Sequence, residues 1–341
     1  TFVASHVEDL RRQGATVSVA AIREDRLHRQ VARKYARLAG AAITTAVRAR
    51  VRGRRYDVVE AHIAFPTGLV AWPAARLGGA RLVLFAHGSD VTRLPWSSSL
   101  RRAMAHRLFR HADLIVATSG YIAAVARDRL GPLRCDPLVV SPGVAMPAPD
   151  EQRADAPRHG IVFVGRLAEG KGVGVLMAAL ARLPALDPSM ADVPVTIVGD
   201  GPDRAELEAA GAALGRPVVT FTGAVTPGEV ATILDRAAVV AVPSTSPEGL
   251  GLTALEGMAH GAIVVATDAG GLAETMRDGH NGFVVPAQDV EALARGLARA
   301  VLTAAGPDGD RLRAAGRETV AAHDPELGAT RLLAAYRELL A

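Results

Sequence analysis

The sequence predicts an α/β protein with two domains, each built on a parallel sheet. Three observations lead to this fold class. Apolar strand-like runs alternate with helix-like segments, a polar segment interrupts this alternation near the middle, and 341 residues are more than one core ordinarily organises. Strands that alternate with helices form parallel sheets, whose ligands bind beyond the carboxyl ends of the strands.

The first domain is expected to cover residues 1–146. It opens with a helix over 1–14, a strand over 15–22 and a basic amphipathic helix over 26–40. Further strands follow in four apolar runs, namely YDVVEAHI, LVLFAHG, LIVATS and LVVSPG. Because the chain opens on a helix, we expect a first inner strand and its following loop to be absent from this domain.

The second domain is expected to cover residues 160–324. A polar, proline-containing segment without periodicity, residues 147–159, forms the linker before it. Its strands are expected in the runs GIVFVGR, VPVTIVGDG, VVTFTG, AAVVAVPS and AIVVATD. Residues 325–341 form a final helix that crosses back to the first domain. Two such domains facing each other form a cleft at the strand ends.

Basic residues are concentrated in the first half of the chain. Residues 1–150 contain 23 Lys and Arg against 11 Asp and Glu, and residues 151–341 contain 16 against 24, so the halves carry +12 and −8. The helix over 26–40 carries the bases Arg26, Arg29, Arg33, Lys34 and Arg37. Two interpretations stay open, an anionic membrane surface as a partner and simple solvation of Arg-rich helices. Nucleic acid is not expected as a partner, because aromatic residues are only 4% of the chain and give no stacking platform.

Cysteine content and hydropathy indicate the compartment. The single Cys135 excludes a disulfide framework and is typical of a cytoplasmic protein. No apolar run reaches the length that spans a bilayer. We therefore expect a cytoplasmic protein, which the bases could hold as a peripheral protein on the inner face of the membrane.

The stretch SPEGLGLTALEGMAHG follows a fully apolar strand and combines an acidic loop with a helix start. Glu248 lies in the loop at the carboxyl end of that strand. Gly249 and Gly251 allow the backbone to approach a ligand closely. The helix then opens with the backbone N–H groups of Leu252 and Thr253, and a helix start of this kind binds anions.

A second carboxylate, Glu256, lies about one turn into this helix. It is too deep to contact the same anion but can reach two adjacent hydroxyls, as a carboxylate does when it holds a ribose. The alternative is that Thr253 and Glu256 form a capping box. That alternative leaves Glu248 and both glycines unexplained.

A second loop, GRLAEGKG from Gly165 to Gly172, follows another strand and nearly matches a phosphate-binding P-loop. Gly172 stands where a P-loop has Ser or Thr for magnesium, which disfavours an ATPase. Lys171 is one of only two lysines in a chain with 37 arginines. Together with Arg166 it predicts an anion site, since a compact ammonium suits a leaving phosphate. Solvated surface charge is the alternative.

Polar residues also follow two strands of the first domain. His62 ends one strand, and His87 begins the HGSD motif after the next, in which Asp90 adds a carboxylate. A structural role for each histidine is the alternative. No cluster of Cys and His along the sequence predicts a metal site. The core motifs of hydrolases (Gly-x-Ser-x-Gly) and of dehydrogenases (Gly-x-Gly-x-x-Gly after a strand) do not occur.

These motifs together resemble one family. GRLAEGKG, VGDGP, FTGAV and the pair Glu248-x7-Glu256 followed by MAHGAIVVATDAGGLAE are similar to the donor domain of retaining glycosyltransferases of family 4, which have the GT-B fold of two Rossmann-like domains. HGSD and VVSPGV are similar to the acceptor domain of that family. The opening TFVASH resembles a branch that acts in exopolysaccharide assembly. Almost the whole chain takes part in the resemblance.

The resemblance implies a retaining hexosyltransferase that uses a UDP- or GDP-sugar and a glycan or lipid-linked acceptor, with no metal or other cofactor. It implies that Arg166 and Lys171 bind the diphosphate, that Glu256 binds the ribose, and that Glu248 binds hydroxyls of the donor sugar. His87 would contact the sugar near the reacting carbon, and Val225 would border the base. Catalytic roles thus fall on Arg166, Lys171, Glu248 and His87. The donor-binding set is Gly165, Val225, Gly249, Gly251, Leu252, Thr253 and Glu256, and the acceptor side has His62 and Asp90.

Two other functions stay open at this point. A nucleotide-sugar epimerase on the same fold would need no acceptor and would leave the basic first half without a role. A non-catalytic nucleotide-sugar-binding protein at a membrane surface would use the same donor site without turnover.

Overall fold

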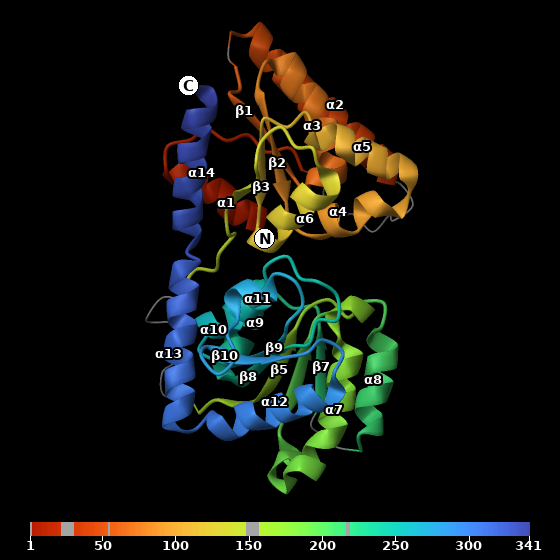
Figure 1. Cartoon of the computed structure of the whole chain (residues 1–341), viewed down its shortest axis with the longest axis vertical. Helices are drawn as coiled ribbons and strands as arrows, with labels where there is room; N and C mark the ends of the chain where they lie inside the picture. The colour runs from red at the N-terminus through yellow and green to blue at the C-terminus, as the bar shows by residue number, and fades with distance from the viewer. Residues whose placement is uncertain (1, 22–30, 54, 148–156, 216–218) are drawn as a thin grey trace. The chain divides into compact units, whose positions relative to one another are not determined.

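The computed structural model describes residues 2–21, 31–53, 55–147, 157–215 and 219–341 (Figure 1). The chain divides into two compact units. Unit 1 consists of Thr1–Pro142 and Pro325–Ala341, and unit 2 consists of Gly143–Asp324. Both sheets are parallel throughout, which confirms the predicted α/β class with two parallel-sheet domains.

Unit 1 is built on a sheet whose described strands follow the order β1-β2-β3-β4. These strands are β1 (Val58–His62), β2 (Arg81–Ala86), β3 (Leu114–Ala117) and β4 (Leu138–Val139). His62, the last residue of β1, lies opposite Phe85 near the end of β2. The residues that follow these two strands therefore leave the sheet at the same edge, its carboxyl edge.

Helices cover both faces of this sheet. They are α1 (Phe2–Arg12), α2 (Val31–Val51), α3 (Ala64–Gly78), α4 (Ser89–Thr92), α5 (Ser99–Phe109), α6 (Gly120–Leu130) and α14 (Pro325–Leu340). Leu82 and Leu84 of β2 face a core shared with α3, α5 and α6. Val83 and Phe85 face the opposite core, which α1 and α14 complete (Figure 1). Burial on both faces explains why the predicted strands are continuous apolar runs.

The predicted strand over 15–22 is wrong for the part that the structure describes. Residues 15–21 have no regular secondary structure, and residue 22 lies outside the described part. Val17 packs against the core of α1 and α14, whereas Val19 is 56% exposed. The alternation therefore holds for Ala15 to Ser18 and ends at Val19. No described strand pairs with this segment, and a strand needs a neighbouring backbone.

The basic helix predicted over 26–40 is represented by α2, which begins at Val31 and continues to Val51. Four of its predicted bases have side chains outside the described part of the chain, namely Arg26, Arg29, Arg33 and Lys34. Among the described helices, none is long and apolar enough to cross a membrane.

Unit 2 has a sheet whose described strands follow the order β10-β9-β8-β5-β6-β7. The strands are β5 (His159–Val164), β6 (Val195–Val198), β7 (Val219–Gly223), β8 (Ala237–Val242), β9 (Ile263–Thr267) and β10 (Gly282–Val285). The sequence did not predict β10. The strand order reverses between β5 and β8, which are direct neighbours. In open parallel sheets this switch point is where ligands bind.

Helices again cover both faces of the sheet. They are α7 (Val173–Leu186), α8 (Arg204–Ala213), α9 (Pro227–Arg236), α10 (Leu252–Ala259), α11 (Leu272–Thr275), α12 (Val290–Thr303) and α13 (Pro307–Ala322), with short 3-10 turns at Glu169–Lys171 and Pro188–Asp192. Ile161 and Phe163 of β5 face a core shared with α7 and α12, and Val162 faces a core shared with α9 and α10.

Candidate functional site

The switch point of unit 2 brings two loops together. One loop leaves β5 and contains Gly165 to Gly172, and the other leaves β8 and leads to α10. The carbonyl of Gly170 accepts hydrogen bonds from the N–H groups of Thr245 and Ser246, both at 3.1 Å. The two sequence motifs are therefore parts of one structure at the carboxyl edge of the sheet.

Two of the predicted catalytic residues form an ion pair in these loops. Nζ of Lys171 lies 2.7 Å from Oε1 of Glu248, and the hydroxyl of Ser244 donates to the same oxygen. The Lys171 side chain is 39% exposed and the Glu248 side chain 18%. The backbone of Glu248 is fixed as well, since its N–H donates to Ala269 and its carbonyl accepts from Gly271. A cation and a carboxylate are thus both held in place and remain open to a ligand.

Gly172, the departure from the P-loop pattern, is explained by the backbone. It has φ of +71°, and a Cβ atom there would lie 1.8 Å from the carbonyl oxygen of Pro243. Only glycine lets the loop after β5 close on the loop after β8. The position that a P-loop uses for a magnesium-binding hydroxyl is therefore used here for contact between the two loops.

Helix α10 begins at Leu252, as predicted. Gly251 precedes it with φ of +87° and provides no side-chain cap. Within the described residues, the N–H groups of Leu252 and Thr253 have no hydrogen-bond acceptor. The capping-box alternative is wrong, because Thr253 lies inside the helix and its hydroxyl donates to the carbonyl of Val164 at 3.5 Å. An anion at this helix start would find donors and a favourable dipole.

Glycines of the loop between β8 and α10 also have structural roles that the sequence did not reveal. A Cβ atom at Gly251 would lie 2.3 Å from a methyl carbon of Leu272, and Gly249 supplies the carbonyl oxygen against which Gly271 packs. The ability of Gly249 and Gly251 to admit a ligand stays a prediction.

Glu256 is half-buried on α10, and burial raises the pKa of its carboxyl, with a partial opposing effect from His260. Nδ1 of His260 in turn lies 2.8 Å from a carboxylate oxygen of Asp235. Glu256 thus ionises less readily than an ordinary glutamate, even though His260 partly opposes the effect of burial.

The remaining predicted donor residues lie near the ends of strands. Gly165 follows β5 directly and donates to the carbonyl of Val198 on β6. Arg166 is exposed, and its guanidinium forms no ion pair with any described residue. Val225 follows β7 and packs partly buried against the core under α9 and α10. Arg166 and Lys171 belong to the same loop, so a ligand there would meet two cations.

In unit 1 the structure brings His62 and His87 together. Nδ1 of His62 lies 3.2 Å from Nε2 of His87. Asp90 has a different position, because its side chain is 1% exposed and accepts hydrogen bonds from the N–H groups of Ala64, His87 and Gly88. Burial raises the pKa of Asp90, and these hydrogen bonds oppose the increase. Asp90 therefore holds the loop that carries His87.

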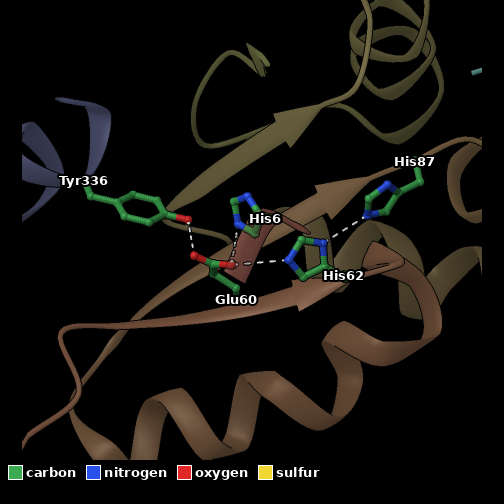
Figure 2. A network of polar contacts seen from close by, with 5 residues as sticks. All are labelled: His6, Glu60, His62, His87 and Tyr336. Carbon is green, nitrogen blue, oxygen red and sulfur yellow. Dashed lines mark hydrogen bonds and ion pairs between the residues drawn. The ribbon is translucent and has the colours of Figure 1, made fainter. Parts of the chain in front are cut away.

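Three residues that the sequence did not single out join this pair (Figure 2). Oε2 of Glu60 lies 3.2 Å from Nε2 of His6 and 3.3 Å from Nε2 of His62. The hydroxyl of Tyr336 donates to Oε1 of Glu60 at 2.7 Å. Burial alone would raise the pKa of Glu60, but the hydrogen bonds from the two histidines and Tyr336 lower it to about 2. Burial is the largest cause of a pKa of His87 lowered to about 3, with smaller contributions from the neighbouring His62 and His6, so His87 is neutral at physiological pH.

One of these three residues, Glu60, could have been identified from the sequence. Glu60 precedes His62 by two positions in a strand, so both side chains point to the same face. His6 and Tyr336 come from the first and last helices and have no local signal. His6, Glu60 and His62 also have ligand atoms within 4.8 Å of one another, a grouping that could hold a metal ion. Because His6 lies far from Glu60 and His62 in the sequence, no cluster of Cys and His along the chain reveals this group.

Comparison with known families matches both halves of the chain. Residues 1–148 match the family described as Glycosyltransferase Family 4, and residues 158–302 match Glycosyl transferases group 1. Three curated relatives are similar over most of this chain. D-inositol 3-phosphate glycosyltransferase of Salinispora tropica is 32% identical over 76% of this chain and 59% of its own length.

Two Mycolicibacterium smegmatis proteins are also 32% identical. GDP-mannose-dependent alpha-(1-6)-phosphatidylinositol monomannoside mannosyltransferase matches over 67% of this chain and 63% of its own length. Alpha-maltose-1-phosphate synthase matches over 76% of this chain and 73% of its own length. The chain thus spans about six-tenths of the length of the first two of these relatives.

Solved structures share the fold. Sucrose-phosphate synthase from Thermosynechococcus elongatus matches with a TM-score of 0.79 and 22% identity, over 99% of this chain and 92% of that one. Anabaena HepE in complex with UDP matches with a TM-score of 0.72 and 22% identity, over 89% and 82%. The chain therefore belongs to the GT-B glycosyltransferases, with a family 4 region followed by a group 1 region.

Proposed function

We propose that this protein transfers a hexosyl group from a nucleoside diphosphate sugar to an acceptor hydroxyl, with retention of configuration. One observation carries the proposal. At the switch point of unit 2, the Lys171–Glu248 pair stands in the same loop structure as the exposed Arg166 and the open start of α10. Cations and helix N–H groups suit a diphosphate, and a carboxylate suits sugar hydroxyls.

In the proposed reaction, the bond between the anomeric carbon and the diphosphate oxygen breaks as the acceptor oxygen bonds to that carbon. Negative charge grows on the leaving diphosphate. Lys171, Arg166 and the N–H groups at the start of α10 stabilise this charge, which needs no metal ion. Glu248 accepts from hydroxyls of the donor sugar, and Glu256 accepts from the ribose hydroxyls. We assign the edge of the base to Val225.

The acceptor hydroxyl loses its proton to the leaving diphosphate on the same face of the sugar, which is consistent with retention and with the lack of an assigned general base. His87 is neutral, so in this proposal it acts through hydrogen bonds to the sugar near the reacting carbon. His62 supports it from the acceptor side. Asp90 acts indirectly, through the loop that it holds.

The donor is proposed to be a UDP- or GDP-sugar, and the acceptor a glycan or a lipid-linked glycan. The relatives that act on inositol phosphate and phosphatidylinositol monomannoside make inositol-containing acceptors the first to test. Exopolysaccharide oligosaccharides, which the motif resemblance suggests, are the second. We further propose a cytoplasmic protein that contacts the inner face of the membrane through the basic residues of unit 1.

A panel experiment tests this function. The protein is first screened for thermal stabilisation by UDP, GDP and ADP and by their hexose conjugates. The stabilising donor is then incubated with each acceptor class, and the anomeric configuration of the product is read by NMR. We expect acceptor-dependent release of nucleoside diphosphate and a retained configuration. Conversion of the sugar without acceptor would indicate an epimerase, and donor binding without turnover on any acceptor would indicate a binding protein.

A further inference from the structure

A series of side chains connects the last helix of the sequence to His87. Tyr336 of α14 donates to Oε1 of Glu60 on β1, while Oε2 of the same carboxylate lies 3.3 Å from Nε2 of His62. The other ring nitrogen of His62, Nδ1, lies 3.2 Å from Nε2 of His87 (Figure 2). His62 therefore connects a carboxylate to His87 through its two ring nitrogens.

The carboxylate determines where the protons of this series lie. An ionised Glu60 only accepts hydrogen bonds, so Nε2 of His6 and Nε2 of His62 must each carry a proton. A neutral His62 protonated on Nε2 has a bare Nδ1, so the proton between the two rings belongs to Nε2 of His87. When a neutral His87 is protonated on Nε2, its Nδ1 is unprotonated, so Nδ1 can accept a hydrogen bond and cannot donate one.

We propose that Glu60 is a positioning residue that, through His62, fixes His87 in the tautomer with its proton on Nε2. The inference rests on the proposed function, in which His87 contacts a sugar near the reacting carbon. In this tautomer Nδ1 of His87 accepts from a sugar hydroxyl, whereas the other tautomer would donate there. The buried Phe85 ring stacks on His62, with centroids 4.3 Å apart, so the orientation of the His62 ring is also fixed.

The tautomer can be measured directly. In the full chain labelled with ¹⁵N, each ring nitrogen of a neutral histidine has a chemical shift that depends on whether it carries the proton. The His87 signals are assigned by their loss in His87→Asn. At about pH 8, above the ordinary pKa of histidine, we expect the proton on Nε2 of His87. A proton on Nδ1 would overturn the proposal, and this result is independent of whether any transferase activity is found.

Variants test the cause. Glu60→Leu removes the acceptor at similar volume, so we expect mixed tautomers of His87 and a kcat lower by about tenfold or more, with KM for the donor unchanged. Glu60→Gln keeps an oxygen acceptor for His62 and should restore the tautomer and most of kcat. His111→Gln, at an exposed histidine of the same unit outside the series, is the matched control and should equal wild type. An unchanged tautomer or an unchanged kcat in Glu60→Leu overturns the proposal.

A metal ion is the competing explanation of the cluster, because two histidines and one carboxylate suit Zn²⁺. In this structure hydrogen bonds already engage the atoms that would bind the metal. Nε2 of His6 and Nε2 of His62 both lie next to one oxygen of Glu60, and Tyr336 donates to the other oxygen. We expect chelator to leave kcat unchanged. Calorimetric binding of one Zn²⁺ that Glu60→Leu abolishes, together with loss of wild-type kcat in chelator, would make the cluster a metal site and overturn the proposal.

Discussion

Lys171 is paired with Glu248, so a substitution at either residue also affects the other. Removal of the ammonium takes a cation from the proposed diphosphate site and, among the described side chains, leaves the Glu248 carboxylate with the hydroxyl of Ser244. We expect Lys171→Ala to lower kcat by about 10² or more, as loss of an electrostatic stabiliser does. Lys171→Arg should also be poorly active, because a planar guanidinium does not replace a compact ammonium.

Steady-state kinetics with the donor found in the panel check this expectation. Arg182→Ala removes an exposed cation of the same unit, on α7, and should leave kcat unchanged. Turnover of Lys171→Ala close to wild type would contradict the assignment of the diphosphate site.

The two glutamates of the motif are expected to separate in binding experiments. Glu256→Gln should weaken a nucleoside diphosphate and its sugar conjugate alike, because the ribose is common to both. Glu248→Gln should weaken only the conjugate. Burial raises the pKa of Glu256, so its carboxylate is lost at a higher pH than an ordinary glutamate with pKa 4.5, and nucleotide affinity should fall on acidification through that higher range.

Calorimetric titration of both variants with both ligands, repeated between about pH 5 and 8, measures these effects. Protonation of the nucleotide's diphosphate affects wild type and Glu256→Gln equally. The ratio of their nucleotide affinities at each pH therefore reports the ionisation of the Glu256 carboxyl alone. Identical ligand profiles for the two variants would mean that the ribose and sugar roles are wrongly divided.

At the residue scale, the sequence revealed side chains that lie in one loop or at the end of one strand. Lys171, Glu248 and the start of α10 belong to this class, because strand order alone brings their loops together. Glu60 and Tyr336 are 276 positions apart in sequence, and only the packing of α14 on the sheet makes them neighbours. Polar contacts of that kind leave no periodic pattern, so the sequence could not predict them.

At the scale of helices and strands, the loops and helices of unit 2 pack very closely against its sheet. Gly257 on α10 illustrates this, since a Cβ atom there would lie only 3.0 Å from the side chain of Val240 on β8. Continuous apolar runs predicted β5 and β8 because both strands are buried on both faces. The short β10 lies at the edge of the sheet, and its apolar run was too short to predict a strand. Residues 15–21 have alternating apolar residues, but no described strand pairs with them.

The contact between the loops after β5 and β8 predicts opposite effects of one substitution at two nearby glycines. Gly172→Ala places Cβ against the carbonyl of Pro243 at a positive φ, so we expect lower stability of unit 2 and loss of nucleotide binding. Gly174→Ala is the matched control. Its Cβ would meet nothing within 4 Å, and alanine inside α7 should stabilise the protein by up to about 1 kcal/mol.

Denaturant unfolding and nucleotide titration of both variants provide the measurements. Equal stability of the two variants, with nucleotide binding intact in Gly172→Ala, would show that the loops do not need this close approach.

For the whole molecule, the chain leaves unit 1 at Pro142 and returns to it at Pro325. The returning helix α14 contributes Leu332, which is fully buried against the face of the sheet formed by Val83 and Phe85. Leu332→Ala should therefore destabilise unit 1 by roughly 2–5 kcal/mol, as other buried leucine truncations do. Leu327→Ala, at an exposed position of the same helix, should change stability by less than about 0.5 kcal/mol.

Hydrogen exchange locates the effect of Leu332→Ala. Amides of β2 and β3 should lose protection, while those of β5 and β8 in unit 2 should keep it. Equal loss of protection in both sheets would show that the two units unfold as one.

The discontinuity of unit 1 also sets an order of events on the ribosome. All of unit 2 has been synthesised when Asp324 is added, whereas one face of the unit 1 sheet lacks α14, one of its two covering helices, until the segment from Pro325 onward has emerged. Val83, Phe85 and Val116 would be only partly covered, and open to water or to a chaperone, throughout translation of the intervening residues. Of the two units, the one that begins to be made earlier is thus the later to complete its core, and nascent chains stalled before residue 325 are expected to be chaperone clients through this apolar face.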